Sequence, residues 1–173
     1  MAERDPGNEP ATNERIPYVA VEINENNIKS KKKAQGKEDK ILQGDKIEHP
    51  DYIQKALDLG YNVEVDVWGY RYSGMLALGH DQPQYDIDYE FLRQDGIWCH
   101  AKNMTSFYNM SKDKDIHCFS HDQDEVALTT KGYFWSGWGN QLTKKSICVM
   151  PPQNEELPSY IAGVCSDYIE DYR

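Results

Sequence analysis

The chain contains no apolar run near the length of about 20 residues that a helix needs to cross a bilayer. Its first fifteen residues, MAERDPGNEPATNER, are polar and lack the apolar segment of a secretory signal. The four cysteines show no CxxC spacing, which argues against a structural zinc knuckle. These absences predict a cytoplasmic protein with no membrane span and with mostly reduced cysteines.

Positive charge is also scarce, because 19 Lys and Arg face 29 Asp and Glu, for a net charge of −10. A chain this acidic is a poor candidate for binding nucleic acid through phosphates, so we expect no nucleic-acid partner. Hydrophobic residues make up 39% of the 173 residues, with 12 Tyr and 4 Trp, which is enough for one folded domain. The sequence does not predict an oligomeric state.

The distribution of polar residues predicts one domain with two polar segments. Residues 1–15 are expected to form a disordered tail, and residues 16–173 the folded domain. Within that domain, residues 24–46 carry a cluster of lysines and are expected to form a flexible loop. Such a cluster could contact phosphates, but it is more often a solvated loop.

The segment HPDYIQKALDLG (49–60) predicts a helix, because Pro50 suits a first helical turn and Gly60 suits a helix end. YNVEVDVW (61–68) reads as a strand, and after the turn GYRYSG the segment MLALGHD returns as a second strand, so that the two form a hairpin or a closely coupled pair. Other strands are expected at 16–23, 96–103, 115–120, 133–136, 146–151 and 164–168. Helices or short turns are expected between them at 85–94, 104–112, 124–132, 141–145 and 155–163.

This alternation of helices or turns with strands predicts an α/β protein with a parallel sheet. With connectors this short, the prediction is a compact TIM-like barrel of about seven short parallel strands, preceded by the polar tail. A doubly wound sheet is the alternative architecture.

Two carboxylates in the strand YNVEVDVW point to a site. Side chains alternate between the faces of a strand, so Glu64, Asp66 and Trp68 share one face while three valines share the other. If the valines pack under helices, the two carboxylates point inward, where an uncompensated charge is costly. A divalent cation such as Mg²⁺ or Ca²⁺ suits paired carboxylates. The alternatives are an exposed strand face or a salt bridge to one of three basic residues, Arg71, Arg93 or Lys102.

The same alternation places other polar and aromatic side chains at the mouth of the expected barrel. The whole inward-facing set is Glu64, Asp66, His80, His100, Lys102, His121 and Trp135. A lysine there could hold a phosphate oxygen, and a histidine could transfer a proton near neutral pH. Each histidine alone is more often a hydrogen-bonded structural residue, and it is their convergence that favours a site.

The tripeptide Gly79–His80–Asp81 lies where a predicted strand ends, which is where barrel active sites lie. Gly79 permits an unusual backbone angle, and His80 could then act as general acid for a leaving alkoxide. The alternative is an ordinary turn that happens to contain a histidine.

EVDVW, a short hairpin, LGHD, WCHAKN and a closing CSDY together resemble the glycerophosphodiester phosphodiesterase-like family. That family belongs to the phosphatidylinositol-specific phospholipase C-like phosphodiesterases, and the nearest likeness is to a short microbial and viral branch. The resemblance runs from residue 49 to residue 168, with HPDYIQKALDLGYNVEVDVW followed by LGHDQPQYDI as its most specific part. LTTKGYFW and SICVMP add to it.

The resemblance implies a barrel that hydrolyses small phosphodiesters with a divalent metal and two histidines. By position, Glu64 and Asp66 match the metal carboxylates, His80 matches the second catalytic histidine, and Lys102 matches a phosphate-binding lysine. His100 stands where larger members have a metal-binding glutamate, and this change softens the site towards nitrogen ligands. The inward-facing set adds His121 and Trp135 as substrate-binding candidates.

One half of the family pattern is missing here. The family opens with a strand ending in His-Arg-Gly, which supplies the first catalytic histidine, whereas this chain reads VEINENN at residues 21–27. A Glu-Asn pair before the first helix is also absent; Glu48 is a possible replacement for its glutamate, and His49 for the lost catalytic histidine. Two functions stay open: a metal-dependent phosphodiesterase, or a catalytically impaired relative that binds a phosphate-bearing ligand or a protein partner. A third possibility is a surface interaction protein whose site is vestigial.

Overall fold

The computed structural model describes residues 18–22 and 48–166, and for 18–22 it describes the backbone alone. The predicted polar tail (1–15) and the predicted lysine-rich loop (24–46) therefore lie outside the described residues. None of the helices that the structure describes is long and apolar enough to cross a membrane.

The chain forms one mixed sheet in the order β4-β3-β2-β1-β10-β9-β8-β7, with β5 added beside β2 and β6 beside β5. The strands are β1 (Tyr18–Glu22), β2 (Asn62–Gly69), β3 (Leu76–Leu78), β4 (Tyr85–Ile87), β5 (Ile97–Ala101), β6 (Cys118–Phe119), β7 (Val126–Leu128), β8 (Phe134–Gly137), β9 (Ser146–Val149) and β10 (Gly163–Cys165). The pairs β6–β5, β5–β2, β2–β1, β1–β10, β10–β9 and β9–β8 are parallel, whereas β2–β3, β3–β4 and β7–β8 are antiparallel.

Strand β2 is the centre of this arrangement because it has three partners. One edge pairs with β5 over residues 63–67. The other edge is divided, since residues 62–64 pair with β1 and residues 67–69 pair with β3. The predicted hairpin between β2 and β3 is thus confirmed, and it lies beyond the end of β1 on the same edge of β2.

Helices cover the outer face of the sheet around β2, β5 and β6. The predicted helix at 49–60 is confirmed as α2 (Pro50–Asp58), which His49 caps and after which Gly60 adopts a positive φ of 82°. Alternation along β2 buries its three valines completely, and they pack with side chains of α2, α3 (Tyr89–Leu92) and α4 (Met104–Met110) in one apolar core. Burial of this apolar surface is the main force that holds the helices against the strands.

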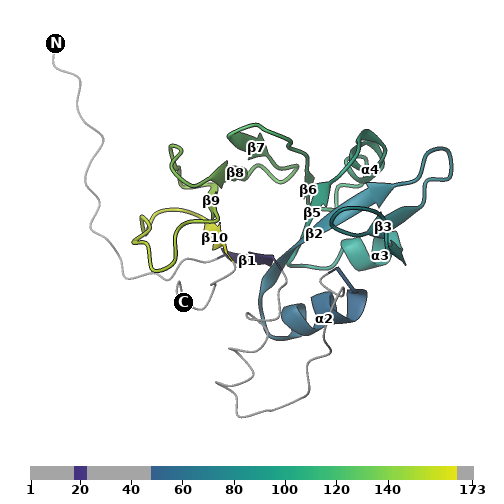
Figure 1. Ribbon diagram of the computed structural model, residues 1–173, viewed down its shortest axis with the longest axis horizontal. Helices are drawn as coiled ribbons and strands as arrows, with labels where there is room; N and C mark the ends of the chain where they lie inside the picture. The colour runs from purple at the N-terminus through teal and green to yellow at the C-terminus, as the bar shows by residue number, and fades with distance from the viewer. Residues whose placement is uncertain (1–17, 23–47, 167–173) are drawn as a thin grey trace.

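The inner face of the sheet has a second apolar core that contains no helical residue. It is made of Trp98, Phe119, Ala127, Trp135, Ile147, Ala162 and Cys165, which come from strands at both ends of the sheet and the segment before β10. Figure 1 shows the strands following an arc, with α2 and α4 outside it. The ends of the arc approach one another, because the rings of Phe119 on β6 and Trp135 on β8 have centroids 4.7 Å apart.

The predicted TIM-like barrel is wrong, because the arc does not close. No strand pairing among the described residues joins β6 to β8; instead the free edge of β8 is taken by β7, which turns back antiparallel. The contact between the two ends is limited to side chains and to the loop residue Thr130, whose N–H donates to the Cys118 carbonyl at 2.8 Å. The doubly wound alternative is not seen either, since the described helices pack on one face of the sheet.

Two connectors predicted to be helices or turns contain strands. Residues 85–94, predicted helical, form the strand β4 followed by the short helix α3, which starts after its N-cap Asp88. Residues 124–132 contain β7. Both of these strands pair antiparallel with a neighbour, and β7 occupies the edge of β8 that a closed parallel barrel would need.

One side chain, Asn103, joins the end of β2 to the start of α4. Its Oδ1 accepts hydrogen bonds from the N–H groups of Ser106, at 2.8 Å, and Gly69, at 3.2 Å, while its Nδ2 donates to the Gly69 carbonyl at 3.1 Å. Gly69 has no room for a side chain, because an added Cβ would lie 2.4 Å from the Ser106 nitrogen. The hydrogen bonds of Asn103 hold the preceding residue, Lys102, beside the inner face of the sheet.

We expect Asn103→Ala to lower the free energy of unfolding by about 1–2 kcal/mol, because it removes a helix cap and the bonds to Gly69. Asn109→Ala, the same change later in the same helix, should cost less than about 0.5 kcal/mol, because Asn109 caps nothing. Urea unfolding followed by tryptophan fluorescence measures both. Equal losses for the two variants would contradict the role given to Asn103.

Candidate metal centre on the inner face

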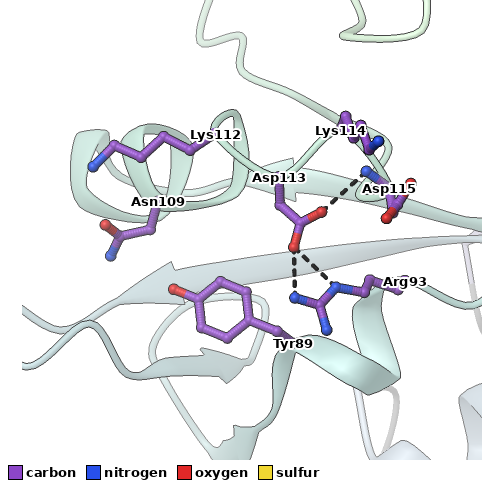
Figure 2. A pocket seen from close by; sticks show the side chains of 7 residues that line it. All are labelled: Tyr89, Arg93, Asn109, Lys112, Asp113, Lys114 and Asp115. Atoms are coloured by element: carbon purple, nitrogen blue, oxygen red, sulfur yellow. Dashed lines mark hydrogen bonds and ion pairs between the residues drawn. The ribbon is translucent and has the colours of Figure 1, made fainter.

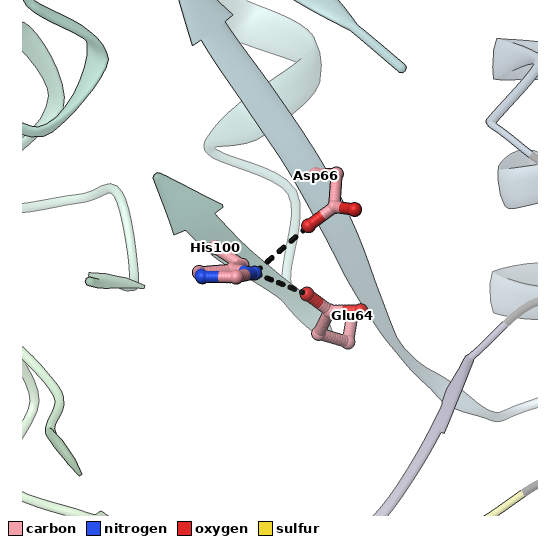
Figure 3. A group of neighbouring side chains, drawn as sticks. All are labelled: Glu64, Asp66 and His100. Carbon is pink, nitrogen blue, oxygen red and sulfur yellow. Dashed lines mark hydrogen bonds and ion pairs between the residues drawn. The ribbon is translucent and has the colours of Figure 1, made fainter. Parts of the chain in front are cut away.

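Two neighbouring strands bring Glu64, Asp66 and His100 together. The parallel register of β2 and β5 sets Asp66 opposite His100 and Glu64 opposite Trp98, so all four side chains share the inner face. Figure 3 shows the two carboxylates reaching from β2 towards one edge of the His100 ring on β5. Each of the three residues offers one ligand atom, and these atoms lie within 4.8 Å of one another.

The imidazole of His100 is the centre of this group. Its Nδ1 lies 2.8 Å from Asp66 Oδ1 and 3.6 Å from Glu64 Oε1, and its Nε2 lies 3.3 Å from the carbonyl oxygen of His121. The side chains of Glu64, Asp66 and His100 are only 12%, 6% and 14% exposed. Water therefore screens their charges weakly, and the carboxylates need positive partners close by.

Lys102 supplies one such partner, with its Nζ 3.2 Å from Asp66 Oδ2. Of the three salt bridges considered from the sequence, this is the one that forms. Its formation does not displace His100, because lysine and imidazole contact different oxygens of Asp66. The Lys102 side chain is 22% exposed, so an anion can approach it from solvent.

Arg93 and Arg71 do not serve the carboxylates. Arg93 donates from Nε and Nη2 to Asp113 Oδ2 at 2.9 and 2.7 Å, in a groove of about 640 Å³ beside α4 (Figure 2). These bonds raise the pKa of Arg93 and lower that of Asp113. The guanidinium of Arg71 lies 5.5 Å from the ring centroid of Tyr72, in the turn after β2.

His121 stands beside His100. The two imidazole rings are stacked with their centroids 4.6 Å apart. The ring of Phe119 is stacked with both of them, and its centroid lies 5.3 Å from that of His100 and 6.0 Å from that of His121. Partial burial, followed by the nearby His100 and Lys102, lowers the pKa of His121. A neutral imidazole next to Lys102 can accept or donate a hydrogen bond to a substrate oxygen.

Trp135, predicted to line the substrate site, lies below it. Its side chain is buried in the second core, with 6% exposed, and it contacts the site through the ring of Phe119. Trp135 therefore supports the stacked rings rather than forming an open wall.

His80 is not part of the group of three ligands. It lies in the turn after β3, 60% exposed, with Nδ1 2.9 Å from Asp81 Oδ1. Gly79 before it has φ of 154°, and a Cβ there would lie 2.0 Å from the Gln82 carbonyl oxygen, so the turn requires glycine. This turn is nevertheless tied to the end of β2, because the Gly79 N–H donates to the Asp66 carbonyl at 3.1 Å.

The two residues considered as replacements for the missing motif lie at the start of α2. His49 is its N-cap, where its Nδ1 accepts from the Asp51 N–H at 3.2 Å, and its ring meets Tyr85 edge-on. Glu48 is buried. Neither residue belongs to the three-residue ligand group found among the described residues.

The donor set fits a divalent cation. One imidazole nitrogen and two carboxylate oxygens, mostly buried and within reach of one another, are ligands that divalent metals use in proteins. Three protein ligands would also leave coordination positions for water or a substrate oxygen.

Two residues that support this site, Phe119 and Asn103, were not predicted from the sequence. Phe119 shares a strand face with His117 and His121, but nothing in the sequence says that it stacks on His100 from the neighbouring strand. Asn103 was visible as a cap signal, since NMTS directly follows a predicted strand and has the spacing of a capping box.

Comparison with known proteins gives few matches. No known family's sequence model matches the chain, and no solved structure matches it. Over 66 residues it is 42% identical to a DNA polymerase of Acanthamoeba polyphaga mimivirus and 41% identical to a DNA polymerase of Pyramimonas orientalis virus. Each match covers 38% of this chain but only 3% and 4% of the respective polymerase, so the chain matches a small part of much longer proteins.

Another inner-face histidine, His117, is buried away from solvent. Its ring lies 3.9 Å from that of Trp98, and its Nε2 is 2.8 Å from Thr129 Oγ1. Burial, with a smaller contribution from Lys131, lowers the pKa of His117 to about 4. The folded protein therefore holds this ring neutral at pH values where the unfolded chain protonates it.

Because the folded pKa lies below the unfolded one, we expect stability to fall as pH drops from about 6.5 towards about 4. In His117→Gln the free energy of unfolding should decrease by roughly 3 kcal/mol less over this pH range than in the unmodified protein, because glutamine does not titrate. Urea unfolding at neutral pH and at the acidic end of this range measures the difference. The same pH-dependent loss in both proteins would contradict a neutral, buried His117.

Proposed function

We propose that this chain is a metal-dependent phosphoric diester hydrolase that acts on a small glycerophosphodiester-like substrate. The observation that carries the proposal is a group of potential metal ligands, Glu64, Asp66 and His100, with the Lys102 ammonium 3.2 Å from one of its carboxylates. A cation site next to a lysine suits a phosphodiester, whose negative oxygens both can hold.

Each residue has a defined task in this proposal. Glu64, Asp66 and His100 hold the cation, which when bound supplies Lewis acidity at a phosphoryl oxygen. Lys102 binds a second phosphate oxygen, and His121 contacts the substrate beside it. A water oxygen attacks phosphorus and loses a proton to solvent while the bond between phosphorus and the leaving alkoxide breaks, and His80 donates a proton to that alkoxide.

A second function, binding without turnover, is favoured by the surroundings of His80. The His80 ring is mostly exposed and contacts Asp81. The His-Arg-Gly motif, which supplies the first catalytic histidine in the family that this sequence resembles, is absent from the sequence. An enzyme that lacks one member of its acid–base pair loses orders of magnitude in rate. The same residues would then hold a phosphate-bearing ligand or a protein partner without cleaving it.

The similarity to two viral DNA polymerases does not favour a nucleic-acid substrate. The matched stretch is 3% and 4% of those proteins, and the net charge of −10 opposes binding to a polyanion.

We expect the purified chain to hydrolyse bis(p-nitrophenyl) phosphate when a divalent metal is present and to stop when EDTA removes it. Asp66→Asn should lower kcat/KM for this substrate by about 100-fold, and Lys102→Ala by about 10-fold. His80→Ala should lower kcat/KM by about 100-fold for glycerophosphocholine, because its leaving alkoxide needs a proton whereas p-nitrophenolate does not. Asp58→Asn is the matched control, since it removes an exposed carboxylate at the end of α2 and should leave the rate unchanged.

Hydrolysis that is independent of metal, or hydrolysis of glycerophosphocholine that survives His80→Ala, would show that the assignment is wrong. Saturable binding of glycerophosphocholine with no turnover, weakened by Lys102→Ala, would instead establish the second function. Isothermal titration calorimetry with the same variants separates the two.

A further inference from the structure

The hydrogen bonds of His100 determine which of its nitrogens is free to bind a cation. Nε2 lies 3.3 Å from the His121 carbonyl oxygen, and a carbonyl can only accept. Nε2 therefore carries a hydrogen and donates it. In the neutral ring the lone pair is then on Nδ1, the nitrogen that faces the two carboxylates.

That orientation is the one found when histidine binds a metal. A ligating imidazole usually donates its second N–H to a carbonyl or carboxylate, which fixes the tautomer and the ring plane. Stacking on Phe119, at 5.3 Å and nearly parallel, fixes the plane of the His100 ring further. Nδ1 lies only 2.8 Å from Asp66 Oδ1, so a proton on Nδ1 joins the two groups when no cation is bound, and a bound cation would take the place of that proton.

The remaining donors suit a transition metal better than Mg²⁺ or Ca²⁺. Ca²⁺ takes six to eight oxygen ligands and Mg²⁺ prefers oxygen ligands in an octahedron, whereas this group offers two carboxylates and a nitrogen. Lys102 also contacts Asp66 at 3.2 Å and offsets part of the negative charge that would attract a hard cation. Imidazole raises the affinity for Mn²⁺, Fe²⁺ and Zn²⁺ by comparison.

From this geometry we infer that the Glu64–Asp66–His100 site selects a divalent transition metal, of the class of Mn²⁺ or Zn²⁺, over Mg²⁺ and Ca²⁺. This replaces the Mg²⁺ or Ca²⁺ expected from the carboxylates alone. The inference rests on the metal site of the proposed function, but it does not depend on turnover.

Isothermal titration calorimetry of the metal-stripped full chain with MnCl₂, MgCl₂ and CaCl₂ tests the selectivity directly. We expect one Mn²⁺ per chain, with a Kd at least about 10-fold below those for Mg²⁺ and Ca²⁺. His100→Gln should abolish this preference. His100→Glu, which keeps a ligand at the same position, should retain binding and reverse the preference towards Mg²⁺ and Ca²⁺.

His49→Asn is the control for metal binding, because it removes an imidazole outside the group and should leave the Mn²⁺ affinity unchanged. Equal or tighter binding of Mg²⁺, or Mn²⁺ binding that neither His100 variant alters, would overturn the inference. If Mn²⁺ is selected but bis(p-nitrophenyl) phosphate is not cleaved, the inference stands and the hydrolase proposal fails. If bis(p-nitrophenyl) phosphate is cleaved with Mg²⁺ and Mn²⁺ is not preferred, the hydrolase proposal stands and the inference about metal selectivity fails.

Discussion

The contact between Asp66 and His100 is the interaction on which the account depends. Asp66 is buried in the middle of β2, the strand with three partners, so its charge cannot reach bulk solvent. Removing a carboxylate from water costs several kcal/mol unless positive or hydrogen-bonding groups replace the water. The parallel register of β2 with β5 supplies His100 directly opposite, and Lys102 follows just past the end of β5.

The fold around this contact explains how it can stay both buried and accessible. Helices α2 and α4 cover the outer face, where the valines of β2 pack. On the inner face, aromatic rings from β5, β6 and β8 pack together next to the site, and His100 stacks on one of them, Phe119. Rigid rings beneath the imidazole limit its rotation, which favours binding of one cation in one geometry.

The local elements could be read from the sequence where a strong periodic signal existed. Alternation in YNVEVDVW gave the correct faces of β2, and Pro50 and Gly60 gave the limits of α2. Strands β4 and β7 were not recognised, because each is only three residues long and too short for a periodic pattern to identify it. Since β7 takes the edge of β8 at which the sheet would close, the barrel prediction was wrong although the parallel pairings around β2 are present.

The site was predictable to the extent that it follows from strand parity. Glu64, Asp66, His100 and Lys102 converge as their positions on β2 and β5 require. His80 and Trp135 do not join them, since the direction of a turn side chain and the depth of a core residue depend on tertiary packing. The stacking of Phe119 and His121 on His100 depends on the β5–β6 register, which no local pattern specifies.

A crystal structure of the chain grown with Mn²⁺, with anomalous diffraction measured at the manganese edge, tests the central claim most directly. The account predicts one anomalous peak bounded by His100 Nδ1 and by carboxylate oxygens of Glu64 and Asp66, with Nε2 still bonded to the His121 carbonyl. Manganese bound elsewhere, with His100 still paired directly to Asp66, would contradict it and leave these residues as a buried ion-pair network.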